Sequence, residues 1–324
     1  MTTGEGFAFL EDLARFGAPV VLFSGGEPLM RPDLPDLAAR AVQLGLRAVI
    51  STNGTLIDEA AAARLKEAGV SYVGISLDGM RANHDRFRAS EGAYDRALRG
   101  LRNCLKAGVK VGLRFTITRG NAAEIPAIFD LAREERVPRI CFYHLVYAGR
   151  AAALMSEDLD HAATRRAVDA IIDRTAALHR SGSPTEVLTV DNHADGVYLY
   201  LRMLRERNPR AEAVRDLLLL SGGNSSGIGI GCVSWDGSVH PDQFWRHVSL
   251  GNVRERKFSQ IWSDLSHPLL AQLRDRRRHL KGRCAGCQYL DLCGGNFRVR
   301  AEAATGDLWA PDPACYLTDE EIGA

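Results

Sequence analysis

Four cysteines near the end of the chain have the spacing of a metal site. Cys284, Cys287, Cys293 and Cys315 form the pattern Cys-x2-Cys-x5-Cys-x21-Cys. A two-residue spacing lets two thiolates converge on one centre from a tight turn, and four buried thiolates without a metal would be costly. Zinc and an iron–sulfur cluster both accept four thiolates, so the spacing alone leaves both open.

The residues after the third cysteine favour the larger group. Gly294 and Gly295 follow Cys293 directly, and adjacent glycines let backbone amides approach a ligand closely and donate to cluster sulfurs. This arrangement suits an iron–sulfur cubane better than a single zinc ion. Of the other cysteines, Cys104 and Cys141 are predicted to pack as small apolar side chains, because free cysteine is commonly buried.

A second set of chemically useful residues occurs in three short turns early in the chain. Residues 24–28 are Ser-Gly-Gly-Glu-Pro, residues 52–55 are Thr-Asn-Gly-Thr and residues 76–79 are Ser-Leu-Asp-Gly. The glycines of the first turn let backbone come close to a small ligand, and its glutamate suits an ammonium group. The aspartate of the third turn suits ribose hydroxyls, although aspartate before glycine is also an ordinary turn former.

These turns lie at the ends of predicted β-strands. Strands are predicted at 20–23, 48–51, 72–77, 111–117 and 139–144, and helices at 34–44, 59–68, 94–107 and 122–135. The strand starts recur every 24 to 39 residues, which fits βα units with parallel strands buried on both faces. Chemistry in such folds gathers at the carboxyl ends of the strands, so the three turns should face one crevice.

The predicted order of elements changes after residue 155. A long helix is expected at 155–180, a short strand at 186–190 and a further helix at 197–220. The glycine- and serine-rich residues 221–231 indicate a boundary, and Asp236-Gly237 predicts a hairpin over 232–240. We therefore expect a barrel domain over residues 1–224 and a smaller domain with the cysteine cluster over residues 225–324.

The composition excludes several classes of function. Lys and Arg number 41 against 40 Asp and Glu, a net charge of +1, which gives no argument for a nucleic acid as partner. The chain has no long apolar run and its first residues lack the pattern of a signal peptide, so no membrane association is expected and the expected location is cytoplasmic. A reducing compartment also favours metal ligation over disulfides for the late cysteines.

The three turns, together with His84-Asp85-Arg86-Phe87-Arg88, resemble the radical S-adenosylmethionine (SAM) enzymes. The late cysteines resemble the SPASM or twitch extension, which carries auxiliary [4Fe–4S] clusters in that superfamily. The resemblance covers nearly the whole chain. It implies an α/β fold in which a partial (β/α)6 radical SAM barrel precedes a C-terminal SPASM/twitch-like iron–sulfur domain.

The chain resembles in particular the NirJ branch, the radical SAM proteins of heme d1 biosynthesis. The runs that carry this are residues 187–196, 231–244, 250–254 and 293–300. The resemblance implies an enzyme that removes propionate side chains from a siroheme-derived tetrapyrrole, 12,18-didecarboxysiroheme, by means of a 5′-deoxyadenosyl radical. Its partners would be this tetrapyrrole and an electron donor.

The resemblance also implies residues for each cofactor. The first turn would meet the methionine amino group of SAM, the second would line the same pocket, the third would face the ribose, and an arginine is a weaker candidate for the methionine carboxylate. In that order the residues are Gly25, Gly26, Glu27, Asn53, Ser76, Asp78 and Arg88. One auxiliary [4Fe–4S] cluster would be ligated by Cys284, Cys287, Cys293 and Cys315.

One departure from the family pattern concerns the radical cluster. Radical SAM enzymes need a Cys-x3-Cys-x2-Cys loop before the Gly-Gly-Glu turn, and this sequence has none. We expect a truncated chain that lacks the first strand and this loop, with the second [4Fe–4S] cluster only in the untruncated protein. Without three thiolates that leave one iron open, the chain should not form the radical. The alternative is a degenerate, non-catalytic relative that keeps the fold for binding.

A second departure concerns the number of auxiliary clusters. Peptide-modifying SPASM enzymes usually carry two such clusters, whereas here Asp242 and Asn296 stand where cysteines are expected. Cys232 is left alone, either as an extra ligand or, in the favoured interpretation, as a packed hairpin thiol. One cluster fits the tetrapyrrole branch better. A peptide-modifying SPASM enzyme and a non-catalytic metal-binding scaffold with structural zinc are the alternative functions.

Two further groups of residues suit a tetrapyrrole substrate. A basic run before the cluster could pair with its carboxylates, although a solvated helix face is the commoner case. The run comprises Arg274, Arg276, Arg277, Arg278, Lys281 and Arg283. Histidines at predicted strand ends or loops could bind iron or donate a proton, and these are His144, His193, His240 and His247. Each histidine is by itself better explained as structural, so no catalytic residue is assigned.

Overall fold

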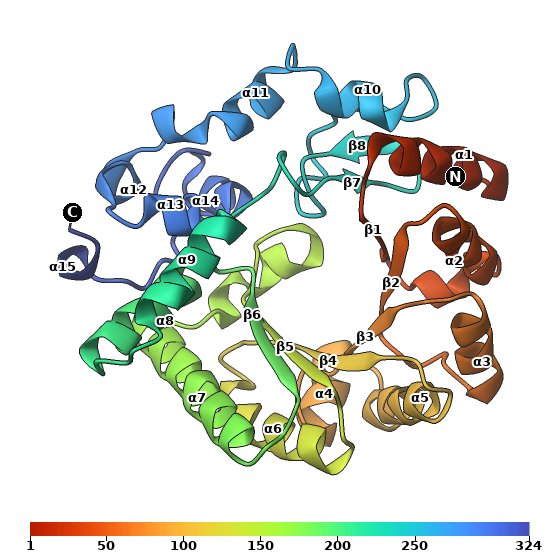
Figure 1. The fold of residues 1–324 in the computed structure, drawn as a ribbon, viewed down its shortest axis with the longest axis horizontal. Coiled ribbons are helices and arrows are strands. Elements are labelled where there is room, and N and C mark those ends of the chain that lie inside the picture. Colours follow the sequence, from red (N-terminus) through yellow and green to blue (C-terminus); the bar gives the residue numbers. More distant parts are fainter. Residues whose placement is uncertain (324) are drawn as a thin grey trace.

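Six parallel strands form one curved sheet in the order in which they occur along the chain. The fold is seen in a computed structural model, which describes residues 1–323. The strands are β1 (Val20–Phe23), β2 (Arg47–Thr52), β3 (Tyr72–Ser76), β4 (Val111–Thr116), β5 (Arg139–Tyr143) and β6 (Glu186–Val190). Figure 1 shows them arranged as an open barrel with the helices on its outside. The predicted α/β partial barrel is therefore confirmed.

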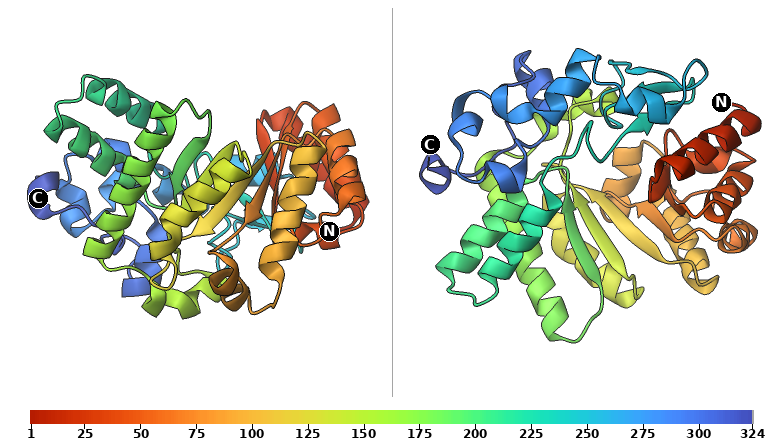
Figure 2. Two further views of the ribbon diagram at one scale, coloured as in Figure 1. Left: turned by 90° about the horizontal axis from the view of Figure 1, so that it is seen from below. Right: turned by 45° about the horizontal axis from the view of Figure 1, so that its top comes forward.

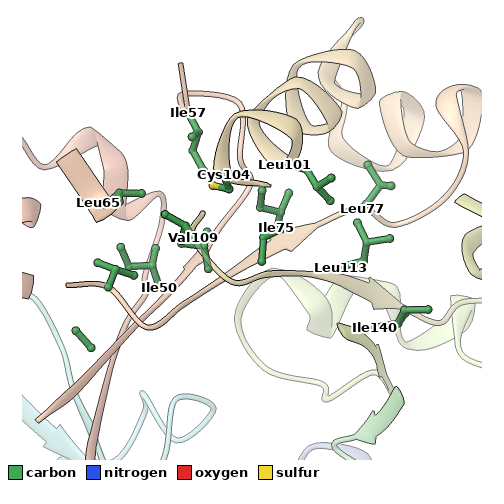
Figure 3. Close-up of a cluster of buried hydrophobic side chains, with 14 of the residues drawn as sticks. Ile50, Ile57, Leu65, Ile75, Leu77, Leu101, Cys104, Val109, Leu113 and Ile140 are labelled. Carbon is green, nitrogen blue, oxygen red and sulfur yellow. The ribbon is translucent and has the colours of Figure 1, made fainter. Parts of the chain in front are cut away.

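The middle strands are apolar because helices cover one face and the barrel interior the other. Ile75 of β3 and Leu113 of β4 are paired in register, and both are buried. Figure 3 shows them packed with Leu101 and Cys104 of the helix that precedes β4. Cys104 has no exposed surface, so this thiol packs as a small apolar side chain, as predicted.

The outer helices of the first half include the four that were predicted and two more, one before β1 and one after β3. They are α1 (Thr3–Phe16), α2 (Leu34–Gln43), α3 (Glu59–Glu67), α4 (Arg81–Arg88), α5 (Ala93–Lys106) and α6 (Ile125–Glu134), with short 3-10 segments η1 (Pro28–Met30) and η2 (Ala122–Glu124). Two of these helices, α1 and α3, begin with a side-chain cap. Asp58 caps α3 by accepting a hydrogen bond from the amide of Ala61, which satisfies one of the free donors of the first turn.

Two predicted helices have different boundaries in the structure. The helix expected at 155–180 is α7 (His161–Arg180), because Asp160 caps it, and residues before it form the 3-10 segment η3 (Gly149–Glu157). The helix expected at 197–220 is two helices, α8 (Ala194–Arg205) and α9 (Ala211–Ser221). Arg207 has a left-handed φ of 52°, and Pro209, two residues later, has no amide hydrogen to donate. The helix α8 therefore cannot continue through these residues.

The C-terminal region begins with a small antiparallel sheet that contains the predicted hairpin. Its strands are β7 (Cys232–Val233), β8 (Ser238–His240) and β9 (Gly251–Asn252). Short helices follow: α10 (Phe258–Ser263), α11 (Pro268–Arg274), η4 (Arg276–Arg278), α12 (Gly282–Gly286), α13 (Leu290–Cys293), α14 (Arg298–Thr305) and α15 (Asp319–Ile322). None of the helices within residues 1–323 combines the length and apolarity needed to cross a bilayer.

The C-terminal region packs against both ends of the open sheet, as the views in Figure 2 show. On the β1 side, α10 lies on α1, where the ring of Phe258 meets that of Phe9 at 5.9 Å, and Asp12 accepts two hydrogen bonds from Ser259. On the β6 side, Arg300 of α14 donates to backbone carbonyls beside β5 and β6. The gap between the first and last strands is thereby spanned by the C-terminal region.

Candidate functional site

The turn after β1 leaves open space for a ligand. Gly25 has a φ of 125°, a conformation that residues with a side chain rarely adopt. A Cβ atom added at Gly25 or at Gly26 would meet no atom within 4 Å. Both glycines therefore border open space at the carboxyl end of the strand, where the sequence predicted a close approach to SAM.

Glu27 ties the first turn to the second. Its carboxylate accepts hydrogen bonds from Thr52 Oγ1 at 2.6 Å, from the Asn53 amide at 2.8 Å and from the Leu29 amide at 3.1 Å. These donors fix the carboxylate at the edge of the sheet. Because each carboxylate oxygen has two acceptor sites, Glu27 can still accept a bond from an ammonium group.

Asn53 and Ser76 lie at the same edge as Glu27 but differ in what their side chains do. Asn53 Oδ1 accepts hydrogen bonds from the amide of Thr55 at 2.8 Å and from its hydroxyl at 2.7 Å, so this oxygen shapes the turn. Ser76 ends β3 opposite Arg114 and is half-buried. Glu27, Asn53 and Ser76 are thus brought together at the carboxyl ends of neighbouring strands.

Asp78 lies deeper than the other predicted SAM residues. Its fully buried carboxylate pairs with Arg88 and accepts a hydrogen bond from the Thr116 amide at 2.8 Å. Its own amide donates to Nδ1 of His84 at 3.0 Å. Arg88 therefore folds back from the last turn of α4 onto Asp78, so that a half-buried guanidinium pairs with a buried carboxylate.

The four late cysteines line one pocket. Cys284 lies in α12, Cys287 directly after it, Cys293 at the end of α13 and Cys315 in the segment before α15. Among the described residues no three Cys, His, Asp or Glu side chains converge closely enough for a single ion. The pocket that the four thiols line has about 410 Å³ of space, part of it open to solvent, which leaves room for a four-iron cubane.

The cost of ionising the buried thiols of the cysteine pocket also favours a bound cationic group. Burial raises the pKa of the Cys315 thiol to about 11, and burial together with the neighbouring thiols raises the pKa of Cys293 further. Four thiolates in this pocket are therefore stable only with a metal centre that carries positive charge. The residues present fit an iron–sulfur cluster.

Gly294, the first glycine after Cys293, serves a different purpose from the one predicted. The amide of Gly294 donates to the carbonyl of Leu290 at 2.7 Å, so it is not free to donate to a cluster sulfur. A Cβ atom on Gly294 would lie 2.9 Å from the amide nitrogen of Asn224. Gly294 is therefore required by the close approach of the 222–224 backbone, and by its left-handed φ of 65°.

Both positions where a second cluster would need cysteine are engaged by protein groups. Asp242 is buried and accepts hydrogen bonds from Ser226 Oγ and from the Phe244 amide. Asn296 donates to Asn192 Oδ1 at 2.7 Å, and its oxygen accepts from the amide of residue 193. Cys232 is half-buried on β7. These contacts leave no second set of four thiols within residues 1–323.

The basic run before the cluster is occupied by contacts within the protein. Its buried member, Arg276, donates to Asn224 Oδ1 and to the carbonyls of Leu273 and Gly294. The other members also bond to carbonyls or pair with carboxylates; they are Arg274, Arg277, Arg278, Lys281 and Arg283. Arg276 is therefore structural, whereas Arg277, Arg278 and Lys281 are exposed and pair with carboxylates at the surface.

Three of the four predicted histidines are held in structural networks. His144 Nε2 lies 2.8 Å from Asp195, which also accepts from the hydroxyl of Tyr316. His240 bonds through both ring nitrogens, and His193 stacks on Phe297. Burial and the nearby Arg300 lower the pKa of His193 to about 4.

One further titratable side chain lies at the same edge of the barrel and was not among the predicted site residues. Asp191 directly follows β6 and has a left-handed φ of 67°. Burial raises the pKa of its carboxyl to about 7, although Arg300 and Arg114 oppose the shift. The only signal in the sequence was a polar residue at the end of a predicted strand.

Comparisons with known proteins agree with this geometry. The sequence matches the model of the radical SAM superfamily over residues 1–132 and that of the SPASM iron–sulfur cluster-binding domain over residues 230–288. Among solved structures, SuiB of Streptococcus suis bound to its precursor peptide SuiA superposes with a TM-score of 0.78 at 18% identity, over 98% of this chain and 70% of the other. Native anSMEcpe with bound AdoMet gives 0.72 at 18%, over 99% and 87%. These structures share the fold.

Three relatives are similar over nearly the whole chain. An Fe-coproporphyrin III synthase of Methanosarcina barkeri is 63% identical over all of this chain and 82% of its own length. A pre-heme d1 synthase of Dinoroseobacter shibae is 45% identical over all of this chain and 80% of its length. A PqqA peptide cyclase of Gluconobacter oxydans is 30% identical over 98% of this chain and 82% of its length.

Proposed function

The chain belongs to the radical SAM superfamily and carries its SPASM extension, and from this we propose that it modifies an iron tetrapyrrole. The observation that carries the proposal is the 63% identity with an Fe-coproporphyrin III synthase along the whole chain. That identity is twice the 30% shared with a peptide cyclase, so a peptide substrate is disfavoured. We propose that the product is an iron coproporphyrin, made by removing carboxylate-bearing side chains from a siroheme-derived tetrapyrrole.

The second candidate is the reaction implied by the resemblance to the heme d1 branch. It removes propionate side chains from 12,18-didecarboxysiroheme, and the 45% identity with a pre-heme d1 synthase favours it. The two candidates share the substrate class and differ in which side chains are lost. In both, the substrate is a flat macrocycle with several carboxylates, and an electron donor is required as a partner.

We propose that SAM binds across the turns after β1, β2 and β3. Gly25 and Gly26 border the open space for its methionine group, and Glu27 accepts from the ammonium. Asn53 and Ser76 lie beside the same space. The ion pair of buried Asp78 and half-buried Arg88 would fix the depth of the ribose and carboxylate end. Glu27 is already oriented by three donors, so binding needs little reorganisation.

We propose one auxiliary [4Fe–4S] cluster, held by Cys284, Cys287, Cys293 and Cys315. The engagement of Asp242 and Asn296 by protein groups supports a single cluster. The chemistry that bound SAM and a cluster with one open iron supply is reductive cleavage of SAM to a radical that abstracts hydrogen from the substrate. The 324 residues contain no Cys-x3-Cys-x2-Cys loop for that cluster. We therefore propose turnover only for a protein that includes this loop.

The test compares binding and turnover. The 324-residue chain, reconstituted anaerobically with iron and sulfide, is titrated with 12,18-didecarboxysiroheme and with a peptide of the PqqA type. We expect it to bind the tetrapyrrole and not the peptide. The same chain extended at its N-terminus by a strand and a three-cysteine loop is then incubated with SAM, dithionite and the tetrapyrrole, and products are identified by mass spectrometry.

The product distinguishes the candidates. Formation of iron coproporphyrin III supports the first, and loss of propionates supports the second. A chain that binds the peptide and no tetrapyrrole would contradict both.

A further inference from the structure

A second pocket lies outside the SAM turns and the cysteine cluster, and its lining residues have no role in either proposed site. It lies between the segment after β5, the loop after β8 and helix α14, and holds about 630 Å³ of space, part of it open to solvent. The residues that matter in its wall are Tyr147, Phe244, Arg246, His247, Val299 and Glu302. A hollow of this size suits a large organic ligand rather than an ion.

Part of this pocket is apolar and held rigidly. Phe244 and Val299 contribute apolar surface, and Tyr147 adds an aromatic ring. The Phe244 ring rests edge-on against Phe297 at 5.7 Å, and Trp245 beneath the loop is almost fully buried. Aromatic and branched side chains fixed by packing are the surfaces that bind flat apolar molecules.

His247 is oriented as metal-binding histidines are. Its Nε2 lies 3.0 Å from Glu302 Oε2, and its ring stacks on Trp245 at 5.7 Å. Histidines that bind a metal through one ring nitrogen almost always donate from the other to a carboxylate or carbonyl, which fixes the ring and raises its basicity. Among the described side chains none pairs with Nδ1, and the His247 side chain is 51% exposed. Nδ1 is the nitrogen available to an incoming iron.

Arg246 adds a cationic group next to this histidine. Its guanidinium stacks on the ring of Trp235 at 4.2 Å, and within the described part of the chain it pairs with no carboxylate. An arginine held by stacking keeps its planar donors free for a carboxylate of a ligand. The loop thus offers a carboxylate-binding group and an iron-binding group at adjacent residues.

The pocket lies at the reactive edge of the barrel. Arg300, one residue after Val299 in α14, donates to the carbonyl of Leu145 at 2.8 Å and to that of Asp191 at 2.9 Å. These carbonyls follow β5 and β6, so the pocket sits at the carboxyl ends of the strands, the same edge as the SAM turns. A ligand in the pocket would therefore lie on the side of the barrel where the radical would form.

We propose that this pocket binds the iron tetrapyrrole substrate, with His247 Nδ1 as an axial ligand of the iron and Arg246 paired with a carboxylate of the macrocycle. The inference rests on the proposed function and goes beyond it, because it assigns the substrate site and its two anchoring residues. Glu302 is a positioning residue that acts through His247. Phe244 and Val299 contact the face of the ring.

The first experiment follows the iron itself. Iron(III) coproporphyrin III is titrated into the anaerobically reconstituted 324-residue chain, and difference spectra in the Soret region and ferric electron paramagnetic resonance spectra are recorded. We expect the spectra of a histidine-bound ferric tetrapyrrole. His247→Ala should lose these spectra and weaken binding about tenfold, and millimolar imidazole should restore them. The matched control is His179→Ala, at the far end of α7, which should change nothing.

The second experiment tests the carboxylate contact. Arg246→Ala should weaken binding of iron coproporphyrin III about tenfold, and Arg246→Lys should recover part of the loss. The tetramethyl ester of the same iron tetrapyrrole has no free carboxylates, so wild type and Arg246→Ala should bind it equally. Circular dichroism and the absorbance of the auxiliary cluster confirm that each variant is folded.

The outcomes separate this inference from the proposed function. If the chain binds iron coproporphyrin III and neither variant alters the affinity or the spectra, the assigned site is wrong and the function stands. If the chain binds neither iron coproporphyrin III nor the metal-free macrocycle, the proposed function itself fails. Unchanged spectra in His247→Ala with weaker binding in Arg246→Ala would overturn the iron ligand.

Discussion

Arg300 and Asp312 form an ion pair with no exposed side-chain surface, joined by two parallel contacts of 2.8 and 2.9 Å. The remaining guanidinium nitrogen donates to the carbonyls of Leu145 and Asp191. Asp312 lies three residues before Cys315, so this pair joins the ends of β5 and β6 to the segment that carries the last cluster cysteine. The barrel and the cysteine pocket are therefore mechanically connected.

We expect Arg300→Met to destabilise the protein strongly. The substitution leaves the Asp312 carboxylate buried without its partner, which typically costs about 3–5 kcal/mol of unfolding free energy. Urea unfolding followed by circular dichroism measures the change. The control is Arg277→Met, which removes an ion pair whose side chains are 64% and 69% exposed, and whose expected cost is below about 1 kcal/mol. Equal losses in the two variants would contradict this account.

We expect Cys287→Ala to abolish the absorbance at about 400 nm of the anaerobically reconstituted chain, because the loss of one of four thiolates leaves one iron without its protein ligand and exposes the auxiliary cluster to solvent. Iron and acid-labile sulfide are measured on the same samples. Cys232→Ala is the matched control and should keep both the absorbance and about four irons per chain. Unchanged iron in Cys287→Ala would rule out the ligand assignment, and iron lost in Cys232→Ala would refute a single cluster.

We expect Glu27→Gln to weaken SAM binding by about tenfold, since the ammonium group of SAM would lose a charged acceptor while the turn keeps its shape. Calorimetric titration of SAM into the reconstituted chain measures this. Glu59→Gln, which removes an exposed carboxylate on α3, is the control and should bind SAM as wild type does. Equal affinities for all three proteins would remove Glu27 from the SAM site.

Asp191 predicts a pH dependence of stability with a definite sign. Its pKa in the folded protein is about 7, above the ordinary value of an aspartate, because burial outweighs the attraction of Arg300, Arg114 and His144 while Asp242 adds repulsion. Between about pH 4 and about pH 7, the Asp191 carboxyl is therefore protonated in the folded state and ionised in the unfolded chain. Stability from this group falls as the pH rises from about 4 to about 7, and the cost persists above that.

The corresponding variant is Asp191→Asn, which cannot ionise. Relative to wild type it should gain on the order of 4 kcal/mol of unfolding free energy between pH 4 and pH 8. Asparagine also tolerates the left-handed backbone at this position, but that contribution does not change with pH. Asp216→Asn, at an exposed position, should show no such gain. A pH-independent difference for residue 191 would refute the raised pKa.

Most of the barrel could be predicted because its signals are local. β1 and β6 have the predicted bounds, since each is a short apolar or β-branched run between turn-forming residues. The helix breaks at Asp160 and Pro209 were missed because the helical period of apolar residues continues across both. A cap and a proline then determine where each helix begins or ends.

In the candidate site, too, features with a local signal could be predicted and contacts between distant residues could not. The cysteine pocket could be predicted because three of its four cysteines lie within ten residues of one another. The pair of Asp78 and Arg88 depends on how α4 folds back over β3, and the contact between His247 and Glu302 joins residues 55 apart. No spacing in the sequence indicates such pairs, because only the packed fold places them together.

The C-terminal region spans the open side of the sheet, and the buried pair of Arg300 and Asp312 connects the segment that carries Cys315 to the ends of β5 and β6. If the proposed auxiliary cluster is bound by Cys315, its oxidative loss should therefore also disturb the proposed substrate pocket at those strand ends. We expect oxygen sensitivity to extend from the proposed cluster to the binding of the tetrapyrrole.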